Sequence, residues 1–378
     1  MKPRIVYWNN IPSPYFVGRM NALVQRGNLD LSVWFNQRRE EDRSWIIDEN
    51  EWMFPFAFND SKVSAGFFRE MIRNKPDLLV SLYNTPKFIS GNLLAKILGI
   101  RTAYRVLPTY DAWVARSRFK EASKRLMFRL VDGVKVPGKD GSMVALKYGV
   151  PPNRIFKVTQ SIDVEHFATA RSMSMAERNR FRDALGVHGC VFIYVGRLWE
   201  GKGLNYLLEA YKRMLPNTSD VSLLIVGDGV DETRYREMAR GVQGVKFAGF
   251  IQERDLPEYY AVADVMVFPT LGDPYGLVVE EAMAAGLPVI CTEAAGDIRL
   301  RLPEAIAGFI VPPKSTDLLF ERMLFLASNL EERLRMGRQA SDLAITRNHD
   351  RYAEDFEHFV ESLLAIPKRK LEAKSNGL

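Results

Sequence analysis

Short apolar runs alternate along the chain with segments whose apolar residues recur every three or four positions. In the first half, five runs have the length and the β-branched or aromatic content of strands, at 4–8, 31–35, 77–82, 101–106 and 132–137. The segments between them show helical spacing and end in glycine or lysine. This pattern predicts strand–helix alternation.

A second series of apolar runs begins near residue 189. Its predicted strands are GCVFIYVG, VSLLIVGDG, VKFAGF, DVMVFP, LPVICT and GFIVPP. Predicted helices separate these runs at about 203–214, 232–240, 255–262, 277–285 and 317–328. Strands that are apolar throughout are typical of parallel sheets covered on both faces. Two successive series therefore predict an α/β protein with two Rossmann-like, doubly wound domains.

The domain boundary is expected within 163–180, a polar stretch without strand character. We expect an N-terminal domain over 1–165 and a C-terminal domain over 166–350. Residues 351–378 are expected to form a helix that packs back on the N-terminal domain, followed by a mobile basic tail. Ligands of open parallel sheets bind beyond the carboxyl ends of the strands, so two facing domains predict a site in the cleft between them.

Composition favours a globular cytoplasmic protein. The 378 residues are 47% hydrophobic and 26% charged, and no apolar run approaches the length of a membrane-spanning helix. The opening MKPRIVYWNN has too few consecutive apolar residues for the core of a signal peptide, so none is predicted. Cys190 and Cys291 both lie in apolar runs, so we expect buried, reduced thiols and neither a disulfide nor a metal site.

Charge is distributed unevenly between the two halves. Residues 1–165 hold 26 Lys and Arg against 16 Asp and Glu, whereas residues 166–378 hold 26 against 30. The basic half predicts an anionic partner, either a membrane surface or a phosphorylated acceptor. Nucleic acid is not expected, because no zinc spacing, RNA-binding signature or basic zipper accompanies the charge.

Two segments of this basic half are amphipathic. Residues 116–131 place Phe119, Ala122, Leu126 and Leu130 along one face among many cations, and residues 65–75 repeat the arrangement. Such helices lie on anionic lipid or pack as solvated outer helices, and both interpretations stay open here.

The first candidate site is the loop YVGRLWEGKG at 194–203. Arg197 and Lys202 follow the strand that ends at Gly196 and precede a helix. A planar guanidinium and a mobile ammonium beside a helix start are suited to a diphosphate, although an ordinary solvated loop has similar residues.

The second candidate loop, LIVGDGVDE, has an incomplete glycine pattern. Gly227 and Gly229 are followed by Glu232 where the dinucleotide fingerprint G-x-G-x-x-G needs a small residue. A tight strand-to-helix turn is the better interpretation, and a nicotinamide-dependent oxidoreductase is disfavoured.

The third candidate site is GDPYGLVVEEAMAAG at 272–286. The amides of Tyr275, Gly276, Leu277 and Val278 are expected at a helix start, where they can bind an anion. On a helical period Glu281 lies on the packed side, where a carboxylate needs a partner such as a ribose hydroxyl. Glu280 points about 100° away and is interpreted as a residue that merely favours the helix start.

These motifs together resemble the retaining glycosyltransferases of family 4. GRLWEGKG, GDG, FAGF, DLPEYYAVADVMVFPT, DPYGLVVEEAMAAGLPVI and AGFIVPPKSTD cover about 190–320 in order, and SIDVEHF at 161–167 matches the family's interdomain strand and loop. The resemblance implies the GT-B fold, in which two Rossmann-like domains face across a cleft. It also implies transfer of a sugar from a UDP- or GDP-sugar to a glycan, lipid-linked or other polar acceptor, as in polysaccharide or glycolipid synthesis. No metal ion is expected, because no D-x-D motif is evident and Arg197 and Lys202 supply positive charge.

The resemblance also implies roles for individual residues. Arg197 and Lys202 would bind the diphosphate, and the amides from Tyr275 onward would meet the distal phosphate. Glu281 would hold the ribose, and Asp273, eight residues earlier, would touch the donor sugar. The remaining donor-site residues implied are Gly196, Gly227, Phe250, Ile251 and Leu256, with the backbone near Phe250 and Ile251 reading the base.

The sequence departs from the family in the first half. Only Gly18 follows the first strand where many relatives have a glycine-rich loop, and none of the four histidines follows the 101–106 strand. Arg105, Tyr110 and Asp111 are the polar candidates for the acceptor side. These departures leave two alternatives, a catalytically silent sugar-nucleotide-binding module and a nucleotide-sugar isomerase of related fold. A peripheral position on the inner face of the cytoplasmic membrane is expected from the basic half.

Overall fold

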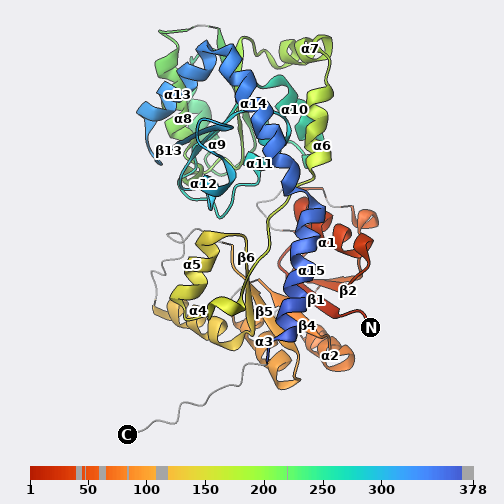
Figure 1. Cartoon of the computed structure of the whole chain (residues 1–378). Coiled ribbons are helices and arrows are strands. Elements are labelled where there is room, and N and C mark those ends of the chain that lie inside the picture. The colour runs from red at the N-terminus through yellow and green to blue at the C-terminus, as the bar shows by residue number, and fades with distance from the viewer. Residues whose placement is uncertain are drawn as a thin grey trace. The chain divides into compact units, whose positions relative to one another are not determined.

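The computed structural model describes residues 1–39, 45–46, 48–58, 65–82, 85–107, 118–218 and 220–367. These residues form two compact units (Figure 1). The N-terminal unit comprises the chain up to Gln160, apart from 45–46, together with the chain from His349 onward. The C-terminal unit comprises Ser161–Asn348 and residues 45–46. The chain therefore leaves the first unit, completes the second and returns to the first.

In the described part of the N-terminal unit, seven parallel strands form one sheet in the order β3-β2-β1-β4-β5-β6-β7. The strands are β1 (Arg4–Asn9), β2 (Asp30–Phe35), β3 (Phe56–Phe58), β4 (Leu78–Ser81), β5 (Arg101–Arg105), β6 (Gly133–Val136) and β7 (Ile155–Lys157). The helices are α1 (Pro14–Arg26), α2 (Ala65–Asn74), α3 (Pro86–Ile97), α4 (Arg118–Leu130), α5 (Lys139–Lys147) and α15 (His349–Ala365).

Both faces of this sheet are buried. One face packs on α1 and on the last helix, α15, whose Tyr352, Phe356 and Phe359 join the core. Helices α1 and α15 lie side by side in Figure 1. The other face is packed by residues of α2, α3, α4 and α5. Burial on both faces explains why the central strands β1 and β4 are mostly apolar.

The C-terminal unit holds a second parallel sheet, of six strands in its described part, in the order β10-β9-β8-β11-β12-β13. The strands are β8 (Cys190–Val195), β9 (Val221–Val226), β10 (Val245–Gly249), β11 (Val265–Phe268), β12 (Val289–Thr292) and β13 (Gly308–Val311). The helices are α6 (Val164–Ala168), α7 (Met175–Leu185), α8 (Leu204–Met214), α9 (Glu232–Met238), α10 (Leu256–Val262), α11 (Val278–Ala284), α12 (Ile298–Arg301), α13 (Thr316–Ser328) and α14 (Leu330–Ala344).

Two hydrophobic clusters, one on each face, cover this second sheet. Every residue of β8 and β9 is buried. The prediction of two doubly wound parallel-sheet domains is confirmed, whereas the cleft between them stays a prediction. The division after Gln160 lies a few residues before the expected boundary, so the short helix α6 opens the C-terminal unit.

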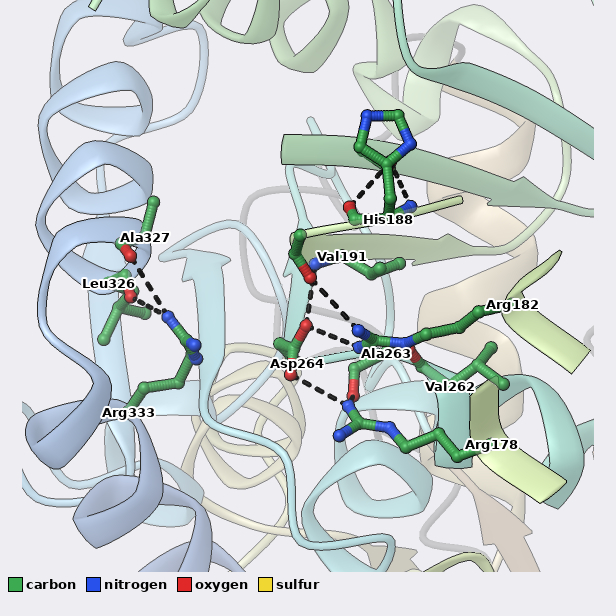
Figure 2. A network of polar contacts seen from close by, with 12 residues as sticks. Arg178, Arg182, His188, Val191, Val262, Ala263, Asp264, Leu326, Ala327 and Arg333 are labelled. Atoms are coloured by element: carbon green, nitrogen blue, oxygen red, sulfur yellow. Dashed lines mark hydrogen bonds and ion pairs between the residues drawn. The ribbon is translucent and has the colours of Figure 1, made fainter. Parts of the chain in front are cut away.

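A polar network fixes α7 at the amino-terminal edge of the second sheet (Figure 2). Asp264, directly before β11, accepts hydrogen bonds from Arg178 Nη2 at 2.8 Å, from Arg182 Nη2 at 2.7 Å and from the amide of Val191 at 2.8 Å. Helix α7 has no fully buried residue of its own. These charge-assisted bonds therefore add to the packing of Phe181 and Leu185 against the core in attaching α7 to the sheet.

The two cysteines and the membrane prediction can be compared with the structure directly. Cys190 and Cys291 are both buried and free, as expected. Within the described residues, no helix has the length and apolar character needed to cross a membrane.

Candidate functional site

The candidate donor residues gather on loops at the carboxyl edge of the second sheet. Because β9, β8, β11 and β12 are neighbouring parallel strands, the loops that follow them leave the sheet on the same side. We call residues 196–203, 227–231, 269–277 and 293–297 the carboxyl-edge loops.

Backbone hydrogen bonds join these loops to one another. The amide of Leu198 donates to the carbonyl of Asp228 at 2.7 Å, and the amide of Leu271 donates to the carbonyl of Gly201 at 2.9 Å. The amide of Asp273 donates to the carbonyl of Ala294 at 3.1 Å. The loops are therefore one braced assembly, which is what a preorganised binding site needs.

Two glycines allow the loops to approach this closely. Gly203 has a φ of 69°, and a Cβ atom there would lie 2.1 Å from the carbonyl oxygen of Pro269. Gly227 has a φ of 131°, and a Cβ atom there would lie 2.0 Å from the carbonyl oxygen of Gly196. Close packing of the backbone therefore explains why both positions are glycine, without a dinucleotide fingerprint.

Lys202 and Asp273 lie together at the centre of the loop assembly. The ammonium of Lys202 forms an ion pair with Asp273 Oδ2, and the Lys202 nitrogen also lies 5.4 Å from the Phe268 ring centroid. The amide of Tyr275 donates to Asp273 Oδ1 at 2.8 Å. Burial raises the pKa of Asp273, but Lys202 and the Tyr275 amide outweigh burial, and the resulting pKa is below the ordinary value.

Arg197 is half-buried on the same loop as Lys202. The carbonyl of Arg197 accepts a hydrogen bond of 2.8 Å from the hydroxyl of Tyr194, a residue buried in β8. This bond fixes the backbone from which the guanidinium extends. Gly196, also half-buried, directly precedes it and donates its amide to Val226 at 3.0 Å.

Glu281 is buried in α11, and it has a protein partner. Its Oε2 accepts a hydrogen bond of 2.9 Å from the hydroxyl of Tyr260 in α10. The residue is only 7% exposed, and burial raises its pKa to about 8. The helical period correctly predicted the packed side for Glu281, and the structure supplies Tyr260 as a partner that sequence reasoning did not identify.

Glu280 was misinterpreted at the sequence level. Its carboxylate is buried and forms an ion pair with the buried guanidinium of Arg301 in α12. Arg301 also donates to the carbonyls of Tyr275 and Gly296, and its guanidinium carbon lies 3.9 Å from the Tyr275 ring centroid. Glu280 therefore anchors the carboxyl-edge loops through Arg301, and it does more than favour a helix start.

The helix start after Tyr275 differs in detail from the expectation. The amide of Tyr275 is taken by Asp273, and α11 begins at Val278. Among the described residues, the amides of Gly276, Leu277 and Val278 make no backbone hydrogen bond. Those three amides are the ones that stay candidates for an anion.

The remaining donor-side candidates line the neighbouring loops. Phe250 and Ile251 directly follow β10, and Ile251 packs against the core cluster that contains α11. Leu256 is buried at the start of α10. The amide of Gly227 donates to the carbonyl of Gly249 at 2.7 Å, so the turn after β9 is tied to the end of β10.

The acceptor-side candidates belong to the N-terminal unit. Arg105 ends β5 and is buried. Gly18 lies inside α1, where a Cβ atom would lie 2.4 Å from His349 Nε2, so its smallness serves the packing of α1 on α15. Tyr110 and Asp111 lie outside the described residues.

Comparison with known proteins finds a family match over these loops. Residues 189–329, which include all four carboxyl-edge loops, match the family model described as glycosyl transferases group 1. The D-inositol 3-phosphate glycosyltransferase of Corynebacterium glutamicum is 29% identical over 208 residues, which are 53% of this chain and 49% of that protein. The sulfoquinovosyl transferase SQD2 of Arabidopsis thaliana is 26% identical over 292 residues, which are 74% of this chain and 55% of that protein. The chain spans about half the length of the curated relatives it matches.

Solved structures share the fold over nearly the whole chain. Anabaena Alr3699/HepE in complex with UDP matches with a TM-score of 0.79 at 18% identity, covering 96% of this chain and 100% of that one. WaaG, a glycosyltransferase involved in lipopolysaccharide biosynthesis, matches with a TM-score of 0.70 at 17% identity, covering 94% and 98%. The two parallel-sheet units are thus those of the GT-B fold. The match to the glycosyl transferases group 1 model is confined to residues 189–329, within the C-terminal unit.

Proposed function

We propose that the chain is a retaining glycosyltransferase of family 4 that moves a sugar from a UDP- or GDP-sugar to a glycan or lipid-linked acceptor, in polysaccharide or glycolipid synthesis. The observation that carries the proposal is the Lys202–Asp273 ion pair, which joins the loops after β8 and β11 at the ligand-binding edge of the sheet. The group 1 family match and the glycosyltransferase relatives support it.

In the proposed donor complex, the diphosphate lies against Arg197, Lys202 and the amides after Tyr275. Lys202 then exchanges part of its interaction with Asp273 for phosphate oxygens, and Asp273 accepts hydroxyl hydrogens of the donor sugar. Glu281 accepts a hydrogen bond from the ribose with the carboxyl group that Tyr260 orients. Gly196, Gly227, Phe250, Ile251 and Leu256 complete the donor pocket, with the backbone at Phe250 and Ile251 contacting the base.

The proposed catalytic contribution is electrostatic. As the glycosidic bond breaks, negative charge grows on the leaving diphosphate, and Arg197 and Lys202 stabilise that charge without needing a metal ion. Retention follows from attack on the same face of the sugar, with a donor phosphate oxygen taking the acceptor proton. Arg105 contributes to the acceptor side from the N-terminal unit.

Calorimetric titration with UDP and GDP tests the donor site. Arg197→Ala and Lys202→Ala should each weaken nucleotide binding by about 1.5–3 kcal/mol, the contribution of a charged hydrogen bond. This corresponds to a roughly 10- to 150-fold larger Kd. Lys246→Ala, an exposed lysine on β10, is the matched control and should bind normally. Unchanged affinity in both loop variants would contradict the proposal.

Turnover separates the enzyme from the silent binding module. The enzyme should release nucleotide diphosphate slowly from its sugar donor even without acceptor, and faster with one, whereas a silent module binds the donor and releases none. The anomeric configuration of the product, read by proton NMR coupling, tests retention.

We further propose that the N-terminal unit associates with an anionic membrane surface. Helix α4 buries Met127 and Phe128, while its Phe119 and Leu126 are 75% and 50% exposed. The apolar face of Phe119, Ala122, Leu126 and Leu130, for which the sequence left lipid contact and packing both open, is thus mostly turned outward among the basic residues of the same helix. An outward apolar strip with cations beside it is the arrangement that binds at a lipid interface.

A further inference from the structure

One buried guanidinium joins two of the carboxyl-edge loops. Arg301, the last residue of α12, is 3% exposed. Its Nη2 donates to the carbonyl of Tyr275 in loop 269–277. Its Nε and Nη2 also donate to the carbonyl of Gly296 in loop 293–297, at 3.2 and 3.1 Å. Because the donors of a guanidinium point in fixed directions within one plane, Arg301 fixes the backbones of the two loops relative to each other.

The two residues that Arg301 holds are the ones that hold Asp273. The amide of Gly296 donates to the carbonyl of Asp273 at 2.9 Å, and the amide of Tyr275 donates to Asp273 Oδ1 at 2.8 Å. The amide of Asp273 donates to the carbonyl of Ala294 at 3.1 Å, in the same loop as Gly296. The backbone and the carboxylate of Asp273 are thus each connected to Arg301 through a single intervening residue.

Asp273 depends on this support because its side chain is short. Only two side-chain torsions separate the carboxylate from the backbone, so the position of the oxygens follows the position of the loop. The other carboxylate oxygen, Oδ2, pairs with Lys202. A ligand-binding side chain is precise when the groups around it are themselves fixed, and Arg301 fixes the loop that carries Asp273.

Stability by itself does not explain the buried ion pair between Arg301 and Glu280. Glu280 is 1% exposed, and its Oε2 has no hydrogen-bond partner among the described residues. Apolar side chains of similar volume are often as stabilising as a buried ion pair. They cannot, however, donate hydrogen bonds to the carbonyls of Tyr275 and Gly296. Glu280 therefore balances the charge of the group that supplies those donors.

The charge of Arg301 also acts on Asp273. Burial alone would raise the pKa of Asp273, whereas Lys202, the Tyr275 amide and then Arg301 lower it. Arg301 therefore favours the ionised carboxylate, which accepts hydrogen bonds and donates none.

We propose that Arg301, with its charge balanced by Glu280, is a positioning residue that sets where Asp273 accepts hydroxyl hydrogens of the donor sugar. The hold of Arg301 on Asp273 rests on the contacts above, and the presence of a sugar at Asp273 rests on the proposed function. A misplacement of about 1 Å costs a reaction about 100-fold in rate. Arg301 should therefore affect turnover of the donor more than affinity for the nucleotide.

Amide hydrogen exchange resolved by NMR tests the hold without a donor. Arg301→Lys keeps a positive charge but cannot present donors to two carbonyls in a fixed plane. Exchange of the Tyr275 and Gly296 amides should accelerate at least about 10-fold. Arg299→Lys, on the exposed side of the same helix, is the matched control and should leave both rates unchanged. Unchanged rates in Arg301→Lys would overturn the inference, whatever reaction the chain catalyses.

Donor turnover tests the role of this support. Nucleotide release from UDP-glucose or GDP-mannose, whichever the wild type hydrolyses, should have a kcat about 10- to 100-fold lower in Arg301→Lys. The Kd of the free nucleotide should change less than about threefold, because Arg197 and Glu281 are held by tyrosines elsewhere in the unit. A loss of nucleotide affinity as large as the loss of turnover would contradict a positioning role.

A double-mutant cycle separates positioning from general structural support. If Arg301 acts through Asp273, Arg301→Lys should lower kcat by less than about twofold in the Asp273→Ala background. A full further loss in that background would show that Arg301 supports the site by another route, and would overturn the proposal. Glu280→Gln/Arg301→Gln is the second variant if Arg301→Lys does not fold, because it leaves no unpaired buried charge. Its control is Arg299→Gln.

The two kinds of measurement also separate this inference from the proposed function. A wild type that hydrolyses neither donor counts against the proposed function. The exchange rates of Tyr275 and Gly296 then still decide whether Arg301 holds Asp273.

Discussion

Glu280 and Glu281 are neighbours in sequence with different environments. Glu281 accepts a hydrogen bond from the neutral hydroxyl of Tyr260, whereas Glu280 pairs with the guanidinium of Arg301. Burial without a nearby cation raises the pKa of Glu281 to about 8. The carboxyl group of Glu281 is therefore mainly protonated at neutral pH, whereas that of Glu280 is fixed in a buried ion pair with Arg301.

Glu281 should make the protein less stable as pH rises. Its ordinary pKa is 4.5, so between about 4.5 and 8 the unfolded chain loses this proton while the folded chain keeps it. The folded state then binds more protons, and the free energy of unfolding falls with pH across this range. Glu281→Gln removes that contribution, so its stability advantage over wild type should grow from pH 5 to pH 8 and then level off.

Urea unfolding at pH 5, 6.5, 8 and 9 measures this difference. The exposed Glu258→Gln, on the neighbouring α10, is the control and should show no pH-dependent advantage. A stability difference that is flat with pH would show that Glu281 is ionised in the folded protein.

Sequence reasoning predicted the burial of a residue from its position within one helix, but it missed partners that come from other helices. The helical period relates residues within one helix, so it placed Glu281 on the packed side. Arg301 comes from α12, a separate short helix, and reaches Glu280 and Tyr275 only through the fold. No spacing in the sequence marks such a partner, and the same is true of Tyr260.

At the level of elements, α7 is held by polar contacts with Asp264 as well as by apolar packing. Replacing Asp264 with Asn removes the charge that Arg178 and Arg182 share (Figure 2). The free energy of unfolding should fall by about 1.5–3 kcal/mol, since hydrogen bonds to charged groups contribute that much. Amide hydrogen exchange over 175–185 should accelerate more than exchange in β8.

The control for this prediction lies on the same helix. Asp183 is exposed on α7, and Asp183→Asn should change neither stability nor exchange. Equal acceleration throughout the C-terminal unit would show that Asp264 supports the whole sheet and not α7 in particular.

Helix α4 offers a second prediction at this scale. Phe119→Ser/Leu126→Ser should reduce flotation of the protein with anionic vesicles by about 10-fold or more, because each apolar side chain contributes about 1.5–3 kcal/mol when fully buried. The control Leu334→Ser removes a similarly exposed leucine, 52% exposed on α14. No binding of the wild type to anionic vesicles would remove the membrane proposal.

Apolar strands of four or more residues were predictable from the sequence, whereas the edge strands β3 and β7 were not. Strands β8, β9 and β11 are buried on both faces and stand out as continuous apolar runs. Strands β3 and β7 have three residues each, too few for a pattern to emerge. The orientation of α4 was left open by the sequence, because a basic helix with apolar residues around much of its surface has no single packing face.

At the level of the whole molecule, the last helix belongs to the first unit. Tyr352, Phe356, Phe359, Val360 and Leu363 of α15 are buried in the core beside α1. Deleting residues 349–378 exposes that face, with a loss of about 1.5–3 kcal/mol for each side chain uncovered. Such a sum exceeds the stability of an ordinary domain, so the N-terminal unit should unfold while Ser161–Asn348 stays folded.

Limited proteolysis followed by mass spectrometry measures this outcome. The truncated chain should be cleaved rapidly within 1–160, and 161–348 should persist as a resistant fragment. Deletion of 368–378 alone leaves α15 complete and should give the wild-type pattern. Persistence of 1–160 in the longer truncation would show that its core is sufficient without α15.

The return of the chain to its first unit also sets an order of assembly during synthesis. Residues 1–160 leave the ribosome before Ser161–Asn348, and the helix that covers one face of their sheet is made after both. The second unit, nearly all of whose residues are continuous in sequence, has its parts while the earlier segment still lacks α15. We therefore expect the second unit to mature first, and the nascent N-terminal sheet to need protection by chaperones until α15 has been made.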